Sequence, residues 1–464
     1  MHHPAPPSPR HGRSRTLRLA LVVTAAALLA AACGAPAGRP SPSPTAPPTR
    51  SPAVTKPATA AATPQSTDLL AGITVTPADL TAAVDSDNAL TVGLLQQLES
   101  SSSDGNFVDS AYSLATVLSM LELGAAGDTQ TQMAAVLDSQ GVSAAQQAAA
   151  WKQLDASLAA TATADGISLD TANGIWLDSG LAANKTFLDT LVSDFSAPSS
   201  QVDFQGDPQG AANTINQWAS SATKGMIPSV VSADQLQAME MVLAGAVYFN
   251  ADWQTQFDPG ATGPGSFYPD SSNPDDQLTV PMMNGSGWTL PYYNRDGVAA
   301  VELPYVGGHY AADIVMPWEQ SMSAFVGGLT PSALAGILQD LSPTQNVDLS
   351  MPRFDVSSQL SLGQTLETLG MPDAFSTAAN FSGIASGAGL QLGFVQQNAL
   401  IQVNEIGTTA AAVTVAGGEG GGGGGPEPPI TVLDIDQPFL FLIRDTTTGA
   451  IVFAAQVADP TASS

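Results

Sequence analysis

The 464-residue chain is 44% hydrophobic, enough to fill a large core, and it carries 41 acidic but only 13 basic residues. A surface this acidic repels phosphate groups and other polyanions, so the composition argues against nucleic-acid and heparin-like partners. Cys33 is the single cysteine, so no disulfide can form within the chain.

The first 33 residues have the features of an export signal. Four arginines between positions 10 and 18 precede an apolar stretch, 19–32, that is too short to span a bilayer comfortably. The segment Leu-Ala-Ala-Ala-Cys-Gly at 29–34 resembles a bacterial lipobox, whose cysteine is acylated and becomes the new N-terminus. We therefore predict a signal peptide over 1–33, a lipid on Cys33 and an extracellular protein that meets the membrane only through this anchor. The alternative is an ordinary signal peptide that leaves a secreted protein with Cys33 unmodified.

Residues 34–67 are mostly Pro, Ala, Ser and Thr. Such a segment buries too little apolar surface to offset the entropy of ordering its backbone, so we predict a disordered, extended linker. Residues 68–464 have the composition of one globular domain without internal repeats. No segment after residue 33 combines the length and the apolarity of a membrane span.

Helical periodicity comes first in this domain. Apolar residues recur at helical spacing over 90–98 and 114–121, and a glycine-containing break at 124–127 separates them from a further helix at 129–137. Strand-like runs follow over 167–177, 241–249, 298–306, 310–316, 347–351, 439–443 and 451–457. Early helices and late, clustered strands predict an α+β domain with large sheets. A nucleotide-binding α/β fold is disfavoured, because strands and helices do not alternate and no glycine-rich phosphate loop opens a helix.

Side chains suited to catalysis or metal binding are scarce. Three of the four histidines lie within the first eleven residues, and His309 sits in a glycine-containing turn. A zinc site needs several His or Cys ligands, and a Ser-His-Asp triad built on His309 would lack a G-x-S-x-G nucleophile elbow. We predict no enzyme activity, no metal and no cofactor. A hydrolase with paired carboxylates stays open as a weaker alternative, because Asp and Glu are abundant.

Nine short segments between about residue 85 and residue 460 resemble, in order and spacing, segments of the serpin family of serine protease inhibitors. They lie at 110–129, 215–227, 247–258, 280–283, 301–305, 351–354, 369–371, 381–383 and 438–444. The resemblance implies the serpin fold, in which helices pack around large mixed and antiparallel sheets and a reactive-centre loop is exposed. It also implies a polar shutter region beneath the central sheet, whose positions here are Ser110, Ser113, Gly245 and Gln397. The family has Asn and His at the last two positions, so we expect that polar link to be altered at both ends.

A second group of residues resembles the hinge of inhibitory serpins: Glu405, Ile406, Gly407, Thr408, Thr409, Ala410, Ala411 and Ala412. Small side chains would let this segment slide between existing strands, whereas a charged residue would resist burial. The alternative is a flexible hairpin loop without a role.

The resemblance implies a suicide-substrate mechanism. A serine protease cuts the loop, and the cut loop inserts into the central sheet and traps the acyl-enzyme. Counting from either side places the cut near Gly421 or near Glu427, and a bond before proline is a poor target. The preferred candidates are therefore Gly418, Glu419, Gly420, Gly421 and Gly422.

The residues around this position restrict the partner. A Glu-specific protease would cut after Glu419, and an elastase- or subtilisin-like one would prefer Val415 or Ala416. Trypsin-like targets are disfavoured, because no Lys or Arg occurs between Arg353 and Arg444. We expect a monomer. A non-inhibitory serpin-fold surface protein, whose loop is only a substrate, is the main alternative, because glycine weakens strand formation.

Overall fold

The structure is a computed structural model that describes residues 68–102, 105–197, 199–237, 239–270, 273, 275–386, 389–408 and 429–462. The predicted signal peptide, the linker, Cys33, the hinge positions 409–412 and the cleavage candidates 418–422 lie outside these residues.

Local sequence sets where most helices begin. A Ser, Thr, Asn or Asp immediately before the helix accepts a hydrogen bond from an N–H group of the first turn in eight of them, which satisfies a donor that has no partner inside the helix. The α-helices are α1 (Pro77–Ser101), α2 (Ala111–Glu122), α3 (Gly127–Val136), α4 (Ala144–Asp165), α5 (Lys185–Phe195), α6 (Pro208–Ala222), α7 (Ala233–Leu236), α8 (Met322–Gly328), α9 (Pro331–Gln339) and α10 (Gly363–Leu369).

The strands form two sheets. The larger one has the order β1-β15-β14-β8-β7-β6-β9-β13, with β5 paired to β6. Its strands are β1 (Phe107–Asp109), β5 (Gly263–Phe267), β6 (Leu278–Arg295), β7 (Val298–Pro304), β8 (Tyr310–Pro317), β9 (Ser342–Pro352), β13 (Thr431–Asp434), β14 (Phe439–Asp445) and β15 (Ile451–Val457).

The second sheet has six strands in the order β10-β11-β12-β4-β2-β3. They are β2 (Ser168–Asp178), β3 (Ser199–Val202), β4 (Met241–Asp252), β10 (Phe354–Ser361), β11 (Phe394–Val403) and β12 (Gly407–Thr408). This sheet is mixed, because β11 runs parallel to β4 and β2 runs parallel to β3, while the other pairs are antiparallel.

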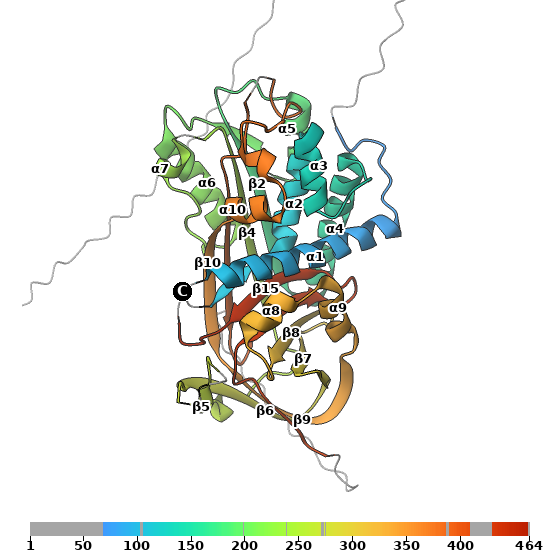
Figure 1. Ribbon diagram of the computed structural model, residues 1–464, viewed down its shortest axis with the longest axis vertical. Helices are drawn as coiled ribbons and strands as arrows, with labels where there is room; N and C mark the ends of the chain where they lie inside the picture. The colour runs from blue at the N-terminus through green and yellow to red at the C-terminus, as the bar shows by residue number, and fades with distance from the viewer. Residues whose placement is uncertain are drawn as a thin grey trace, which may run out of the picture. The chain divides into compact units, whose positions relative to one another are not determined.

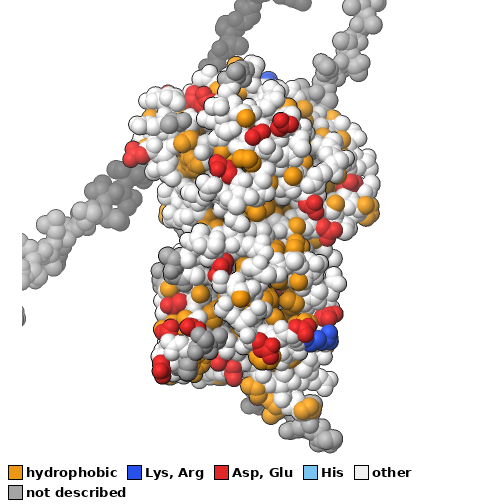
Figure 2. Space-filling view, viewed as in Figure 1, with side chains coloured by type: hydrophobic (Ala, Val, Ile, Leu, Met, Phe, Trp, Pro, Cys, Tyr) orange, Lys and Arg blue, Asp and Glu red, His pale blue; other side chains and the backbone are white. Residues whose placement is uncertain are grey.

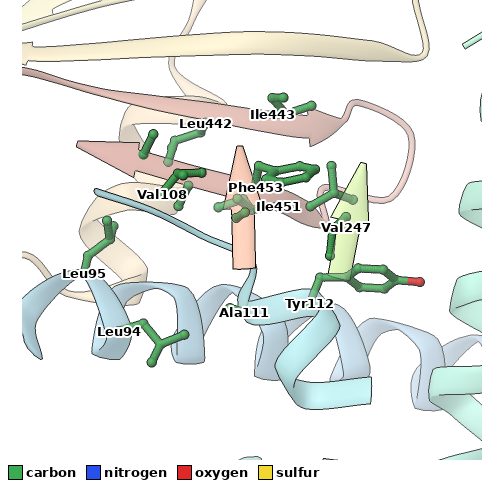
Figure 3. Close-up of a cluster of buried hydrophobic side chains, with 14 of the residues drawn as sticks. Leu94, Leu95, Val108, Ala111, Tyr112, Val247, Leu442, Ile443, Ile451 and Phe453 are labelled. Atoms are coloured by element: carbon green, nitrogen blue, oxygen red, sulfur yellow. The ribbon is translucent and has the colours of Figure 1, made fainter. Parts of the chain in front are cut away.

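Figure 1 shows α1 crossing the middle of the molecule, with α2 beside it and β15 just below. All twelve residues of α2 are buried. Apolar side chains from α1, β1, α2, β4, β14 and β15 meet around the start of α2, as Figure 3 shows for Leu94, Val108, Tyr112 and Phe453. The hydrophobic core therefore lies between the early helices and the two sheets, and α2 is its centre.

The predicted α+β class is confirmed, and each helix and strand predicted above has a counterpart in the structure. Only the start of the long strand β6 was indicated, by the resemblance at 280–283; its full length was not predicted, because Pro281, Gly285 and Gly287 interrupt its alternation. Its pairing with β9 shifts register between Gly285 and Trp288, which accommodates these residues. Among the described residues, no single helix is both long and apolar enough to cross a membrane. Only α8 and α9 taken together reach that length and apolarity, and the two helices are sharply bent relative to each other.

Candidate functional site

The candidate hinge begins with a tight reversal of the chain at the end of β11. Residues 404–406 form the turn, and the two residues of β12 then run back antiparallel to β11, with Thr408 opposite Val403. The other edge of β12 pairs antiparallel with the end of β4, with Gly407 opposite Asp252 and Thr408 opposite Ala251. The start of the hinge thus already lies between β11 and β4 as a short strand.

Backbone contacts hold the turn in place. The N–H of Trp253 donates to the carbonyl of Ile406 at 2.7 Å, and the N–H of Phe257 donates to the carbonyl of Glu405 at 3.0 Å. The indole N–H of Trp253 donates to the carbonyl of Asn404 at 2.9 Å. The segment that follows β4 therefore anchors all three residues of the turn.

Glu405 is anchored by its side chain as well. Its carboxylate accepts hydrogen bonds from the Arg353 guanidinium and, at 2.7 Å, from the Thr262 hydroxyl. Burial opposes ionisation, but these donors outweigh it and hold the pKa of Glu405 below its usual value. The carboxylate is therefore charged at neutral pH, and its contribution to stability is lost only as the pH falls through this lowered pKa.

The glycine at 407 is required by the close approach of β4. A Cβ at this position would overlap the carbonyl oxygen of Ala251, so any larger residue would push β12 out of the sheet. Thr408 is buried beside it, and its hydroxyl lies 2.6 Å from the Tyr305 hydroxyl. Tyr305 is itself fixed by stacking on the Trp253 ring, with centroids 4.6 Å apart and an angle of 10° between the planes.

The Tyr305→Phe variant tests how firmly this contact holds Thr408. We expect the loss of one buried hydrogen bond to lower the free energy of unfolding by roughly 1 kcal/mol, since the Thr408 hydroxyl would keep no partner there. Amide hydrogen exchange of β12 should quicken more than that of β10. Unchanged exchange in β12 would mean that the backbone pairing alone holds the hinge.

Beyond this short strand, β4 and β11 are only partly joined. Their parallel pairing covers five residue pairs, from Phe394 opposite Val242 to Asn398 opposite Ala246. Among the described residues, the direct pairing ends there, and the two strands continue to either side of β12 at their far ends. Within the described part of the chain, 247–250 of β4 and 399–402 of β11 therefore have no strand between them, and this interval is called the gap below.

Two of the predicted shutter positions lie in the directly paired part of this sheet, and the other two, Ser110 and Ser113, lie at the start of α2. Gln397 of β11 and Gly245 of β4 are register partners. The buried amide of Gln397 accepts from the Ser110 N–H at 3.0 Å and donates to the Ser110 carbonyl at 2.8 Å. The expectation of a polar link altered at both ends was therefore incomplete, because Gln397 binds the start of α2 twice.

Near the predicted shutter positions Ser113 and Gly245, a polar contact comes from a residue that was not singled out from the sequence. Asn173 of β2 lies opposite Gly245, and its side-chain oxygen accepts a hydrogen bond of 2.7 Å from the Ser113 hydroxyl. A Cβ at Gly245 would come within 2.8 Å of that hydroxyl. The side chain at this place in the sheet thus comes from the neighbouring strand, and the glycine gives it room.

Other sequence candidates have no such surroundings. The exposed His309 bonds Asp165 of α4 through its ring and its backbone, as expected for a turn residue. No group of three or more metal-ligating side chains is found in the part of the chain that the structure describes. The face in Figure 2 carries scattered acidic side chains and very little Lys or Arg.

Comparison with known proteins agrees with this geometry. Residues 85–460 match the family described as Serpin (serine protease inhibitor). Iripin-5 of Ixodes ricinus is 31% identical over 80% of this chain and 93% of its own length. Human thyroxine-binding globulin complexed with its ligand is 26% identical, with a TM-score of 0.71 over 83% of this chain and all of that one. The insect Serpin48 of Tenebrio molitor, described as highly specific, is 25% identical, with a TM-score of 0.69 over 83% of this chain and 99% of that one.

Serpins are mostly protease inhibitors rather than catalysts, although the family includes non-inhibitory members. The matched residues contain both candidate regions described above, the hinge at 405–408 and the shutter. This chain belongs to the serpin family and has the serpin fold.

Proposed function

We propose that this serpin inhibits a serine endopeptidase as a suicide substrate, by inserting its cleaved loop between β4 and β11. The observation that carries the proposal is the position of β12, which already pairs with β11 on one edge and with β4 on the other. A strand inserted between two parallel strands can run antiparallel to both, as β12 does, and can hydrogen-bond on both edges.

The register on both sides supports the proposal further. Continuing the pairing of Thr408 with Ala251 and Val403 would bring residue 412 opposite Val247 on β4 and opposite Ala399 on β11. These are the residues immediately beyond the last direct pair, Ala246 and Asn398. The four residues 409–412 would therefore fill the gap, and any further insertion would have to separate β4 from β11.

The side chains of this segment suit both faces of the gap. Because side chains alternate along a strand, residues 410 and 412 would share the buried face with Thr408. Their neighbours would be Phe249 and Ile401, then Val247 and Ala399, all of which are buried. Alanine fits between such residues without displacing them, which favours insertion over a bulkier sequence.

The proposed target is a serine protease of the elastase, subtilisin or Glu-specific type. Support comes from the residues 413–422, which offer Val, Ala, Gly and one Glu but no Lys or Arg. We further propose a monomer that works outside the cell, tethered through Cys33 or secreted. The signal-like residues 1–33 support this location.

The competing proposal is a non-inhibitory serpin whose loop is cut without trapping the enzyme. Its support is the glycine run at 417–425, together with the likeness to thyroxine-binding globulin, whose solved structure holds thyroxine.

Melting temperatures before and after loop cleavage separate the two proposals. An inhibitory serpin should melt at a much higher temperature once cleaved, because the inserted strand pairs on both edges. Incubation with elastase, subtilisin and a Glu-specific endopeptidase should also give a complex that survives boiling in detergent, whereas trypsin should give none. If cleavage leaves the melting temperature unchanged and every enzyme stays active, the inhibitory proposal is wrong.

A further inference from the structure

Two buried carboxyl groups lie at the two ends of α2. Asp109 comes two residues before the helix and is 0% exposed, and Glu122 is its last residue and is 1% exposed. In the described part of the chain, no hydrogen-bond donor reaches either carboxyl oxygen of either residue. Such groups are rare in native proteins, because a buried charge without a partner costs several kcal/mol.

A third acid lies beside the first. Asp87 of α1 is also fully buried; one of its oxygens accepts from the Ile451 N–H at 3.1 Å, and the other has no partner among the described residues. The ionisable group facing this pair is Tyr112 of α2, whose pKa is raised by burial and in part by the charge of Asp87. Tyr112 also interacts with Asp155 of α4 and Tyr310 of β8. None of them is a cation, and among the contacts of the described residues only the Ile451 N–H favours a charged carboxylate, at Asp87.

The surroundings favour the protonated form of these groups, and Glu122 is partly protonated at neutral pH. Burial alone raises the pKa of Asp109 to about 8 and that of Glu122 to about 7. Burial, and then the charge of Asp109, raise the pKa of Asp87 well above its usual value. Figure 3 shows why: the residues that flank Asp109 and Ser110, Val108 and Ala111, lie among apolar side chains of α1, β14 and β15.

Asp109 also lies between two residues, Val108 and Ser110, that are hydrogen-bonded to the six-stranded sheet. The N–H of Val108 donates to the Ser358 hydroxyl of β10 at 2.9 Å, and Ser110 is bonded twice to Gln397 of β11. Asp109 itself pairs with Ala454 of β15. Water drawn in to solvate an ionised Asp109 would therefore enter where β1 and α2 hold β10 and β11.

We propose that Asp109 and Glu122 form a proton-dependent latch that keeps α2 packed under the sheet. In their neutral form they hold the shutter closed. When they lose their protons, water enters at both ends of α2, and β4 and β11 separate more easily. The latch regulates the loop insertion proposed above and rests on that function: the uncut inhibitor should last longest in acidic medium and insert its own loop faster as the medium becomes alkaline.

The direction of the pH dependence follows from proton counting. Between the ordinary carboxyl pKa of about 4 and the raised pKa of about 8, the folded state binds protons that the unfolded state has released. Stability therefore falls as the pH rises through this window. A serpin whose acids are all exposed or paired would show the opposite trend or none.

The test compares the full chain with the double variant Asp109→Asn, Glu122→Gln, whose side chains stay neutral at every pH. The urea midpoint of the wild type should fall steadily between pH 5 and pH 9, and the half-life of the uncut native form at 37 °C should fall at least several-fold. The double variant should lose a large part of both effects, and the fall that remains belongs to Asp87. Asp355→Asn, which changes an exposed carboxylate on β10, should keep the wild-type dependence.

The outcomes separate the latch from the inhibitory function, because urea midpoints need no protease. A wild-type midpoint that stays constant or rises between pH 5 and pH 8, or a double variant with the full wild-type fall, would overturn the latch. If the double variant fails to fold, the infrared carbonyl band of protonated carboxyl groups in the wild type at pH 6 decides: its absence overturns the proposal. If the urea midpoints behave as expected but no detergent-stable complex forms with any protease, the latch proposal stands and the proposed inhibition is contradicted.

Discussion

If this serpin inhibits as proposed, replacing Ala410 with glutamate is expected to turn it from an inhibitor into a substrate. The register of β12 would place residue 410 on the buried face, between Phe249 and Ile401. A carboxylate there has no partner, and burying it costs several kcal/mol, so insertion of the cut loop slows while hydrolysis of the acyl-enzyme does not. Since each 1.4 kcal/mol is about a factor of ten in rate, the number of inhibitor molecules consumed per trapped enzyme should rise by roughly tenfold or more.

Thr409→Glu is the matched control, because it adds the same side chain one residue earlier. Residue 409 would lie opposite Asn250 and Gln402, which are only partly buried, so its carboxylate could stay hydrated. Gel analysis of trapped complex against cleaved inhibitor should show a small effect for this variant. Equal trapping by both variants would mean that the inserted strand does not continue the register of β12.

Gln397→Leu is expected to cause the largest loss of stability in the shutter. The leucine leaves the N–H and the carbonyl of Ser110 buried and without their present partner. Each such group costs about 1–3 kcal/mol, so the free energy of unfolding should fall by roughly 2–5 kcal/mol. Urea unfolding of the uncut protein measures the loss. On storage, the native form should also convert faster to a form in which the uncut loop is inserted into the sheet.

Gln359→Leu provides the comparison for that variant. Gln359 lies on the neighbouring strand β10 at an exposed position, so its replacement should change stability by no more than about 0.5 kcal/mol. Two equally mild variants would show that the bonds from Gln397 to Ser110 contribute nothing net. Two equally severe ones would point to a general intolerance of leucine in this sheet.

Much of the fold was predictable, because many of its helices and strands have a recognisable hydrophobic pattern in the local sequence. The helical periodicity at 114–121 predicted α2, and the short apolar runs at 439–443 and 451–457 predicted β14 and β15 of the larger sheet. Most of the strand β6 was not predicted, because its proline and glycines break the alternation on which such a prediction depends. Sheet order and register were out of reach, since they join residues far apart in the chain.

The same limit applies to the candidate site. The hinge was visible as a continuous segment, but the residues that anchor it were not: Arg353 lies 52 positions from Glu405, and Tyr305 lies 103 positions from Thr408. Asn173 was missed for a further reason. Its role depends on standing opposite Gly245, and one sequence does not reveal which residues face each other across strands.

The length of β11 has a consequence for the glycine run. A strand laid along all of β11 in the register of β12 would run from Thr408 to residue 417, where the polyglycine begins. The glycines, which are the residues least suited to strand geometry, would then lie beyond the end of β11. They would therefore not hinder formation of the inserted strand. They would act instead as a short tether. An enzyme attached anywhere within 417–422 would then be held close to the end of the sheet at which β11 begins.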